Sequence, residues 1–182
     1  MLNIQKFLSE IDRQKLVSIG APVDRTFVMK NLKFDVKPTT EHVEIGQDGH
    51  RVIIAGSTHN GEDEIALKIF AEKIKKYPDI KLLLALRHTT RLPQVLPLIE
   101  NTGLSYGFRS KGDTFKDKDI IVLDTMGELG KMYSICSFAF IGGSFNNTGG
   151  HNPLEATVYS KPTVTGPSIH NFRDIYWLLS QS

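Results

Sequence analysis

A glycine-rich stretch between two apolar runs holds residues whose types suit the binding of an anion. It reads GGSFNNTGGHNPLE over residues 142–155 and is followed by a second apolar run at 161–166. Glycine inside a regular element costs about 0.5–1 kcal/mol relative to alanine, so the run needs a structural or functional reason. Asn152 followed by Pro153 is typical of a helix start. The free N–H groups of a helix start attract anions, which predicts a phosphate site here.

Glu155 has two interpretations at this stage. A carboxylate at the third helical position repels a phosphate directly on the helix end, but it could accept hydrogen bonds from sugar hydroxyls beside that phosphate. Alternatively, Asn152 and Glu155 form a variant capping box and the glycines only turn the chain. The stretch contains no G-x-x-x-x-G-K-[ST] pattern, so it is not a P-loop.

Polar residues also follow the other apolar runs. Arg87 and His88 lie in RHTTR, where arginine suits a planar grip on phosphate or carboxylate, the alternative being a solvated strand end. Two further segments could also bind a ligand. In STHNGED, where the alternative is a helix cap, the candidates are Ser57, Thr58 and His59. In DTMGEL, where the alternative is a tight turn, they are Met126, Gly127 and Glu128. Cys136, the single cysteine, is interpreted as a small buried hydrophobe, and no Cys/His pattern has metal-ligand spacing.

These candidates must be positioned by the elements between them. Five apolar runs are expected to be strands: 51–57, 80–87, 119–124, 138–143 and 161–166. Helical patterns at 62–77, 92–103, 126–136, 152–160 and 171–180 separate or follow them. This alternation predicts an α/β fold with a Rossmann-like, doubly wound parallel sheet, in which ligands bind beyond the carboxyl ends of the strands.

The composition favours an ordinary globular protein. The formal net charge of +2 is too small to indicate nucleic-acid binding. No apolar run approaches the length of a spanning helix, and the N-terminal residues lack the apolar core of a signal peptide. Taken alone, the chain is expected to be soluble and cytosolic.

Six segments occur in an order that resembles the 3-deoxy-D-manno-octulosonic acid (Kdo) transferases. The resemblance covers about residues 16–177, and GGHNPLE is its most specific motif; the segments are NLKFD, STHNGE, LRHTTR, GLSYGFRS, DTMGELGKMYSICSFAFIGGSF and GGHNPLEATVYSKPTVTGPSIHNF. It implies the C-terminal, nucleotide-binding half of a GT-B glycosyltransferase, truncated at its C-terminus. Residues 1–50 would then be the end of the N-terminal domain and a linker, and residues 51–182 an incomplete Rossmann-like domain.

The resemblance also implies a chemistry. Kdo would move from CMP-Kdo to a lipid A precursor with inversion, in lipopolysaccharide biosynthesis, without metal or cofactor. Arg87 and His88 would approach CMP, the Met126–Gly127–Glu128 turn would meet the cytidine, and Glu155 would hold ribose hydroxyls. The phosphate would be surrounded by Gly143, Ser144, Gly149, Gly150 and Asn152.

The resemblance further implies what this chain would not do alone. The general base, the acceptor cleft and a membrane anchor belong to the family's N-terminal domain, so the isolated chain is expected to be inactive, soluble and prone to self-association, with no catalytic residue of its own. The full-length enzyme would act at the cytoplasmic face of the bacterial inner membrane. The alternatives are a nucleotide-sugar epimerase, another GT-B sugar transferase, or a non-catalytic nucleotide-binding module.

Overall fold

The structure is a computed structural model that describes residues 5–7, 10–28 and 36–181. The chain divides into two units, Met1–Val36 and Lys37–Ser182. In the first unit, β1 (Gln5–Phe7) pairs in parallel with β2 (Thr26–Val28), and α1 (Glu10–Ser18) connects them. The sequence also predicts a strand at 26–36; its NLKFD motif at 31–35 lies outside the described residues.

The second unit is built on a six-stranded sheet in the order β5-β6-β4-β3-β7-β8. All of its paired neighbours are parallel. The strands are β3 (Arg51–Thr58), β4 (Ile80–Leu86), β5 (Tyr106–Phe108), β6 (Ile120–Val122), β7 (Cys136–Ile141) and β8 (Thr163–Thr165). The order reverses between β3 and β7, because the chain adds strands on one side of β3 before it crosses back to the other side. The predicted doubly wound parallel sheet is therefore confirmed.

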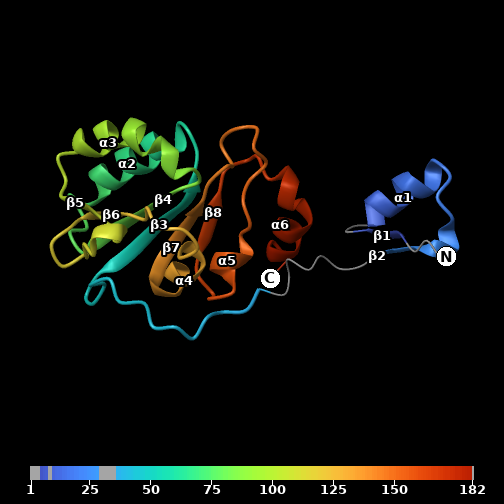
Figure 1. Cartoon of the computed structure of the whole chain (residues 1–182), viewed down its shortest axis with the longest axis horizontal. Coiled ribbons are helices and arrows are strands. Elements are labelled where there is room, and N and C mark those ends of the chain that lie inside the picture. The colour runs from blue at the N-terminus through green and yellow to red at the C-terminus, as the bar shows by residue number, and fades with distance from the viewer. Residues whose placement is uncertain (1–4, 8–9, 29–35, 182) are drawn as a thin grey trace. The chain divides into compact units, whose positions relative to one another are not determined.

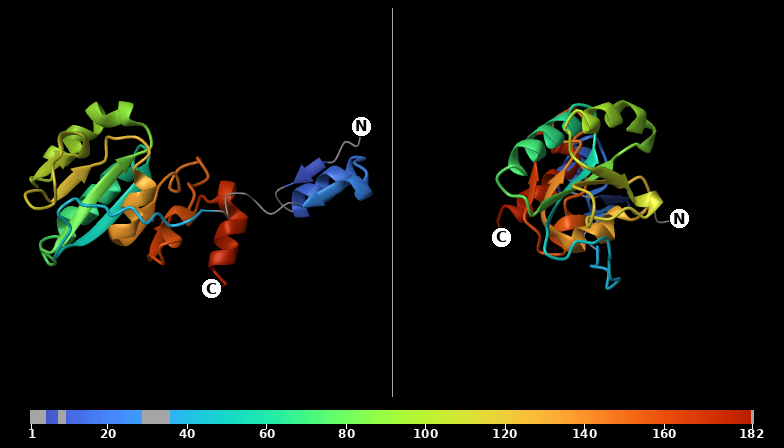
Figure 2. Two further views of the ribbon diagram at one scale, coloured as in Figure 1. Left: turned by 60° about the horizontal axis from the view of Figure 1, so that its bottom comes forward. Right: turned by 90° about the vertical axis from the view of Figure 1, so that its left-hand side faces the viewer.

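Helices cover both faces of this sheet (Figure 1). They are α2 (Glu62–Lys73), α3 (Leu92–Glu100), α4 (Leu129–Met132), α5 (Leu154–Thr157) and α6 (Arg173–Leu179). Single turns of 3-10 helix lie at Val23–Arg25, Thr89–Arg91, Arg109–Lys111, Tyr133–Ile135 and His170–Phe172. Figure 2 shows α2 and α3 on one face and α4 and α5 on the other. Among the described residues, no helix combines the length and apolar character that crossing a bilayer requires.

The side chains of β4 explain why its sequence is apolar at every position except Lys81, which forms an ion pair with Asp119. Leu82 and Leu84 belong to the core under α2 and α3, whereas Leu83 belongs to the core on the opposite face. Successive side chains of a strand point to opposite faces, so a strand covered on both sides needs apolar residues at every position. Cys136 is buried in the second core, and burial raises the pKa of its thiol to about 11. The thiol is therefore protonated at neutral pH, which agrees with the interpretation of Cys136 as a small buried hydrophobic residue.

Residues 37–50 are expected from the sequence to belong with the first segment, but they contribute to the second unit. Val43 and Ile45 are buried in its core together with β3 and β7. The structural division falls at Val36/Lys37 because these two apolar side chains pack against the sheet. The origin of the preceding residues in an N-terminal domain stays a prediction.

The sequence pattern of residues 62–77, which include α2, predicts that Ile65, Ile69, Phe70, Ile74 and Tyr77 share one side of the helix, but of these only Phe70 is buried. Ile65 and Ile69 are 43% and 51% exposed, whereas Glu62, Asp63, Leu67 and Phe70 are buried. The helix is thus rotated so that two acids of its first turn face inward. This rotation has a direct consequence for the loops at the strand ends.

Candidate functional site

A cavity of about 400 Å³ lies at the carboxyl ends of the central strands. Its lining comes from the ends of β3 and β4, from the segments that follow β4 and β6, and from α4 and α5. The lining residues are Ser57, Ala85, Leu86, Arg87, Thr89, Leu123, Thr125, Met126, Gly127, Leu129, Gly130 and Glu155. Five residues predicted from the sequence to bind a donor are therefore brought together here, namely Ser57, Arg87, Met126, Gly127 and Glu155. Thr125 also lines the cavity and was not among the residues predicted from the sequence.

Two opposite charges face each other at this cavity. Burial raises the pKa of Glu155, while the positive charge of Arg87 opposes that rise. A partly buried carboxylate beside a guanidinium offers an acceptor and a donor to the same ligand. This pairing suits a ligand with hydroxyl groups close to an acidic group.

The Met126–Gly127 turn presents backbone rather than charge to the cavity. Gly127 has a φ of +79°, which an L side chain rarely adopts, and the Met126 side chain is 84% exposed. The carboxylate of Glu128 is occupied locally, since it accepts a hydrogen bond from the Thr125 hydroxyl and pairs with Lys131 at 3.2 Å. These contacts lower the pKa of Glu128, the Thr125 bond most of all. The carboxylate thus holds the turn, while contact with a base through the backbone stays a prediction.

A protein carboxylate occupies the glycine-rich turn that follows β7. Glu62 is 1% exposed. Its Oε1 accepts hydrogen bonds from the N–H groups of Ser144 (2.8 Å) and Phe145 (3.0 Å). Its Oε2 accepts from the N–H groups of Gly143 (2.7 Å) and His59 (2.8 Å). The turn is an anion site, as its residue types suggest, but the protein fills it with its own carboxylate.

The predicted roles of Gly143 and Ser144 therefore need correction. Their N–H groups are bonded to Glu62 and do not point to a phosphate. The Ser144 side chain is fully buried, donates to the Ile141 carbonyl (2.8 Å) and accepts from the Gly166 N–H (2.8 Å). Ser144 thus ties the end of β7 to the end of β8.

Gly149 and Gly150 also have structural partners. Both have positive φ, +90° and +80°. The Gly150 N–H donates to the Gly143 carbonyl, and the Gly149 carbonyl accepts from the Asn171 N–H. A Cβ on Gly149 would lie 2.5 Å from the His170 ring. These contacts fold the loop back on itself and occupy the Gly150 N–H, whereas the Gly149 N–H has no protein acceptor among the described residues.

Asn152 lies one position before the N-cap of the following helix, which is Pro153 and not Asn152 as the sequence predicts. The Asn152 side-chain oxygen accepts a hydrogen bond from the Leu154 N–H at 3.2 Å. The helix is shorter than expected, since α5 spans only Leu154–Thr157. Within the described part of the chain, no hydrogen bond joins the Asn152 N–H to the Glu155 carboxylate, so the reciprocal half of a capping box is not formed. Glu155 is thereby left available to the cavity.

Three histidines from different strand ends gather close together. His59 follows β3, His88 follows β4 and His151 follows β7. The Nε2 atoms of His59 and His151 are 2.9 Å apart, and their rings stack with centroids 5.1 Å apart. The His88 ring meets His59 edge-on at 5.9 Å. His59 and His88 were candidates from the sequence; His151 was not, although it stands in the same motif as Gly149 and Asn152.

Burial sets the protonation of this histidine group. It lowers the pKa of His151 to about 4, with the charges of His59 and Arg87 acting in the same direction. Burial also lowers the pKa of His59, and Glu62 opposes that effect. Both rings are therefore neutral at pH 7, and one Nε2 donates to the other.

Thr58 and Arg91 stabilise the first turn of α2 instead of facing the cavity. The buried Thr58 hydroxyl donates to Asp63 at 2.5 Å. Arg91 forms an ion pair with the other oxygen of the same carboxylate, and Asp63 is 1% exposed. Asp63 thus links the end of β3 to the Thr89–Arg91 turn that follows β4.

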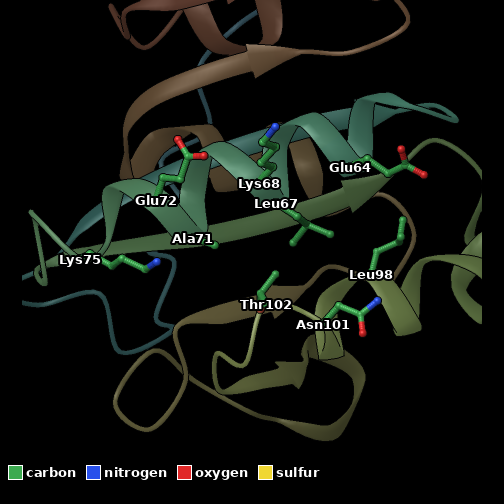
Figure 3. A pocket seen from close by; sticks show the side chains of 9 residues that line it. All are labelled: Glu64, Leu67, Lys68, Ala71, Glu72, Lys75, Leu98, Asn101 and Thr102. Carbon is green, nitrogen blue, oxygen red and sulfur yellow. The ribbon is translucent and has the colours of Figure 1, made fainter.

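A second hollow lies between α2 and α3 and shares no residue with the strand-end cavity. It measures about 520 Å³, and Leu67 and Leu98 point into the space between the helices (Figure 3). Glu64, Glu72, Lys68 and Lys75 line it with balanced charge. This mixture of small, charged and apolar groups does not favour any one class of ligand.

Comparison with known proteins gives sequence and structural relatives, although no protein-family model matches the chain. The C-terminal CMP-Kdo binding domain of WaaA from Acinetobacter baumannii superposes with a TM-score of 0.70 and 31% identity, covering 74% of this chain and 71% of that one. The chain belongs to the Kdo transferase family. The 3-deoxy-D-manno-octulosonic acid transferase of Haemophilus influenzae is 34% identical over 93% of this chain, and that of Aquifex aeolicus 35% identical over 90%.

The match to these Kdo transferases is partial in length. This chain spans 42% of the Haemophilus protein and 44% of the Aquifex protein. The putative UDP-N-acetylglucosamine 2-epimerase of Listeria monocytogenes shares the fold with a TM-score of 0.56 but only 13% identity. The sequence-based assignments to the Kdo transferases and to the GT-B fold are confirmed.

Proposed function

We propose that residues 37–182 form the donor-binding domain of an inverting Kdo transferase, with CMP-Kdo as donor. The observation that carries this proposal is the strand-end cavity, in which Arg87, the Met126–Gly127 turn and Glu155 meet. Its position fits the general rule for open α/β sheets. The likeness to the WaaA CMP-Kdo binding domain supports the choice of donor.

Each side of the cavity would meet a different part of CMP. The backbone of the Met126–Gly127 turn would face the cytosine, and the Glu155 carboxylate would accept hydrogen bonds from the ribose hydroxyls. Arg87 would hold the phosphate, because a guanidinium grips a phosphate with two parallel hydrogen bonds. Among the described residues, the N–H groups of Gly149, His151 and Asn152 have no protein acceptor, so this loop keeps backbone donors for that phosphate.

The whole reaction is also part of the proposal. Kdo would be transferred to a lipid A precursor in lipopolysaccharide biosynthesis, at the cytoplasmic face of the inner membrane, without metal or covalent intermediate. The general base and the acceptor cleft would belong to the N-terminal half of the enzyme. The self-association expected from the sequence stays a prediction, although Trp177 and Leu178 of α6 are 61% and 47% exposed.

Nucleotide binding tests the donor assignment. We expect CMP to raise the melting temperature of the 182-residue chain and UMP, UDP and AMP to raise it much less. A ligand at 100 times its dissociation constant adds about 2.7 kcal/mol to the free energy of unfolding. Thermal shift measurements with the four nucleotides distinguish the hypotheses. A preference for UDP would favour the epimerase or another sugar transferase and would contradict this proposal.

A transfer assay tests the division of labour between the two halves. We expect residues 1–182, expressed alone, to bind CMP but to transfer no Kdo. General acid–base groups typically contribute 10²- to 10⁴-fold to a rate, and the acceptor site would be missing as well. Product is followed by mass spectrometry with CMP-Kdo and a lipid A precursor. Measurable transfer, with or without a metal chelator, would place the base in this chain.

A further inference from the structure

The three clustered histidines lie at the sheet's topological switch point, beside the proposed nucleotide cavity. His59 and His151 follow β3 and β7, the neighbouring strands between which the strand order reverses. Ligands of open α/β sheets bind in the crevice outside the strand ends at this point. His88 adjoins Arg87 in the chain, and Arg87 lines the cavity. The charge of Arg87 acts on both His59 and His151, so the cluster borders the cavity on its Arg87 side.

No protein carboxylate satisfies these imidazoles. Apart from the bond between His59 and His151, no hydrogen bond involves the rings of His59, His88 or His151 in the part of the chain that the structure describes. Glu62 is the acid whose charge reaches both His59 and His151, but its two oxygens already accept four backbone N–H groups. Donors without an acidic partner, next to an arginine, are suited to an anionic ligand.

The ligand proposed for this domain carries two acidic groups. CMP-Kdo has one phosphodiester and one carboxylate, and both are attached to the anomeric carbon of the sugar. Two anions on one carbon need two adjacent sets of donors. Arg87 and the nearby backbone N–H groups form one set, and the histidines form the other.

We infer that His59, His88 and His151 form the subsite for the carboxylate of the donor sugar. This inference rests on the proposed function, because it assigns a second anionic group of the same ligand. It also explains how the domain could distinguish an acidic sugar nucleotide from a neutral one. Imidazoles also bind transition metals, but the described residues contain no group of three or more His, Cys, Asp or Glu side chains arranged to hold a metal ion.

Binding at this subsite should take up protons. The groups that face the two paired rings are Arg87, His88, Arg91 and Glu62, and the positive charges among them favour the neutral imidazole. A carboxylate placed against the rings would favour the protonated form and raise their pKa. The affinity for CMP-Kdo should therefore increase as the pH falls from 8 to 6, more steeply than the affinity for CMP, which lacks the carboxylate.

Titration calorimetry with CMP and CMP-Kdo tests the inference on the 182-residue chain. Wild type is expected to bind CMP-Kdo more tightly than CMP. His88→Asn and His151→Asn should each weaken CMP-Kdo binding by about tenfold while CMP affinity changes by less than about threefold. His42→Asn is the matched control, because His42 is exposed, lies in the segment before β3 and has no ring contact with the cluster among the described residues; it should change neither affinity. Melting temperatures identify any variant that fails to fold, and His88, whose side chain is exposed, is the position where that risk is smallest.

The outcomes separate the two levels of the proposal. If wild type does not bind CMP, the proposed function fails and the subsite fails with it. If CMP binds but both histidine variants weaken CMP and CMP-Kdo equally, the proposed function stands and the carboxylate subsite is overturned. Repeating the titration in two buffers of different ionisation enthalpy should show proton uptake for CMP-Kdo that is smaller in His151→Asn. Equal uptake in wild type and this variant would also contradict the inference.

Discussion

Replacing Glu62 with alanine is expected to lower the free energy of unfolding by at least about 3 kcal/mol. The carboxylate is 1% exposed and accepts four backbone hydrogen bonds, which join the loop after β7 to the loop after β3. Each buried N–H left without an acceptor costs about 1–3 kcal/mol, and breaking a buried charged interaction typically costs about 3–5 kcal/mol. Urea denaturation followed by circular dichroism measures the change.

A second substitution separates this hydrogen-bonding role from the volume of the side chain. Glu62→Gln keeps the shape but directs an NH₂ group at backbone N–H donors, so we expect a loss of at least about 2 kcal/mol. Glu64→Gln is the matched control, because Glu64 lies in the same helical turn and is exposed; its effect should stay within about 0.5 kcal/mol. Similar effects of the two glutamine variants would show that the four bonds contribute little.

The fold could be predicted because it depends on patterns local in the sequence. Residues 80–87 form an almost continuous apolar run up to Leu86, and the strand that they form is covered on both faces. The alternation of such runs with helical patterns leaves few topologies, and the doubly wound sheet is one of them. The short strand β5 was missed because its three residues, Tyr106–Phe108, include a glycine and carry too little pattern to distinguish them from a loop.

The anion site could be predicted only in part, because its occupant comes from far along the chain. Glycines at 142 and 143 did indicate exposed backbone N–H groups, and such groups do converge there. Glu62 stands 81 residues before Gly143, and nothing local shows that its carboxylate turns inward. An acid in the first helical turn is normally interpreted as a solvated partner of the helix dipole. The sequence signal for an inward-facing Glu62 was its position close to His59, in a turn that follows a buried strand.

His151 was missed for a similar reason. Its neighbours in the sequence indicate only a loop, whereas its significance comes from rings that follow β3 and β4. Histidines after three separate parallel strands were visible in the sequence, and the carboxyl ends of such strands meet at one edge of the sheet. That shared edge predicts proximity, although the 2.9 Å approach of two Nε2 atoms requires the register of the sheet.

Glu155→Gln is expected to weaken CMP binding by about tenfold or more and to leave folding stability nearly unchanged. A charged carboxylate can accept from two ribose hydroxyls, whereas the amide has a single acceptor oxygen. A hydrogen bond to a charged group is worth about 1.5–3 kcal/mol, which corresponds to at least a tenfold change in affinity. Titration calorimetry with CMP measures it. The control ligand is 2′,3′-dideoxy-CMP, which lacks both hydroxyls and should bind wild type and variant about equally.

The stability half of this prediction follows from the direction of the pKa shift. Burial raises the pKa of Glu155 in the folded state, so the folded chain holds this proton more tightly than the unfolded chain. The protonated side chain therefore stabilises the fold when the pH is below the ordinary glutamate pKa. This stabilisation is lost as the pH rises through the higher pKa that Glu155 has in the folded state. At pH 7 the buried charge is therefore a cost, and a neutral glutamine should leave the unfolding free energy unchanged or slightly higher. A capping residue behaves differently: its loss lowers stability at pH 7 and leaves CMP affinity intact, and that pair of results would return Glu155 to a purely structural role.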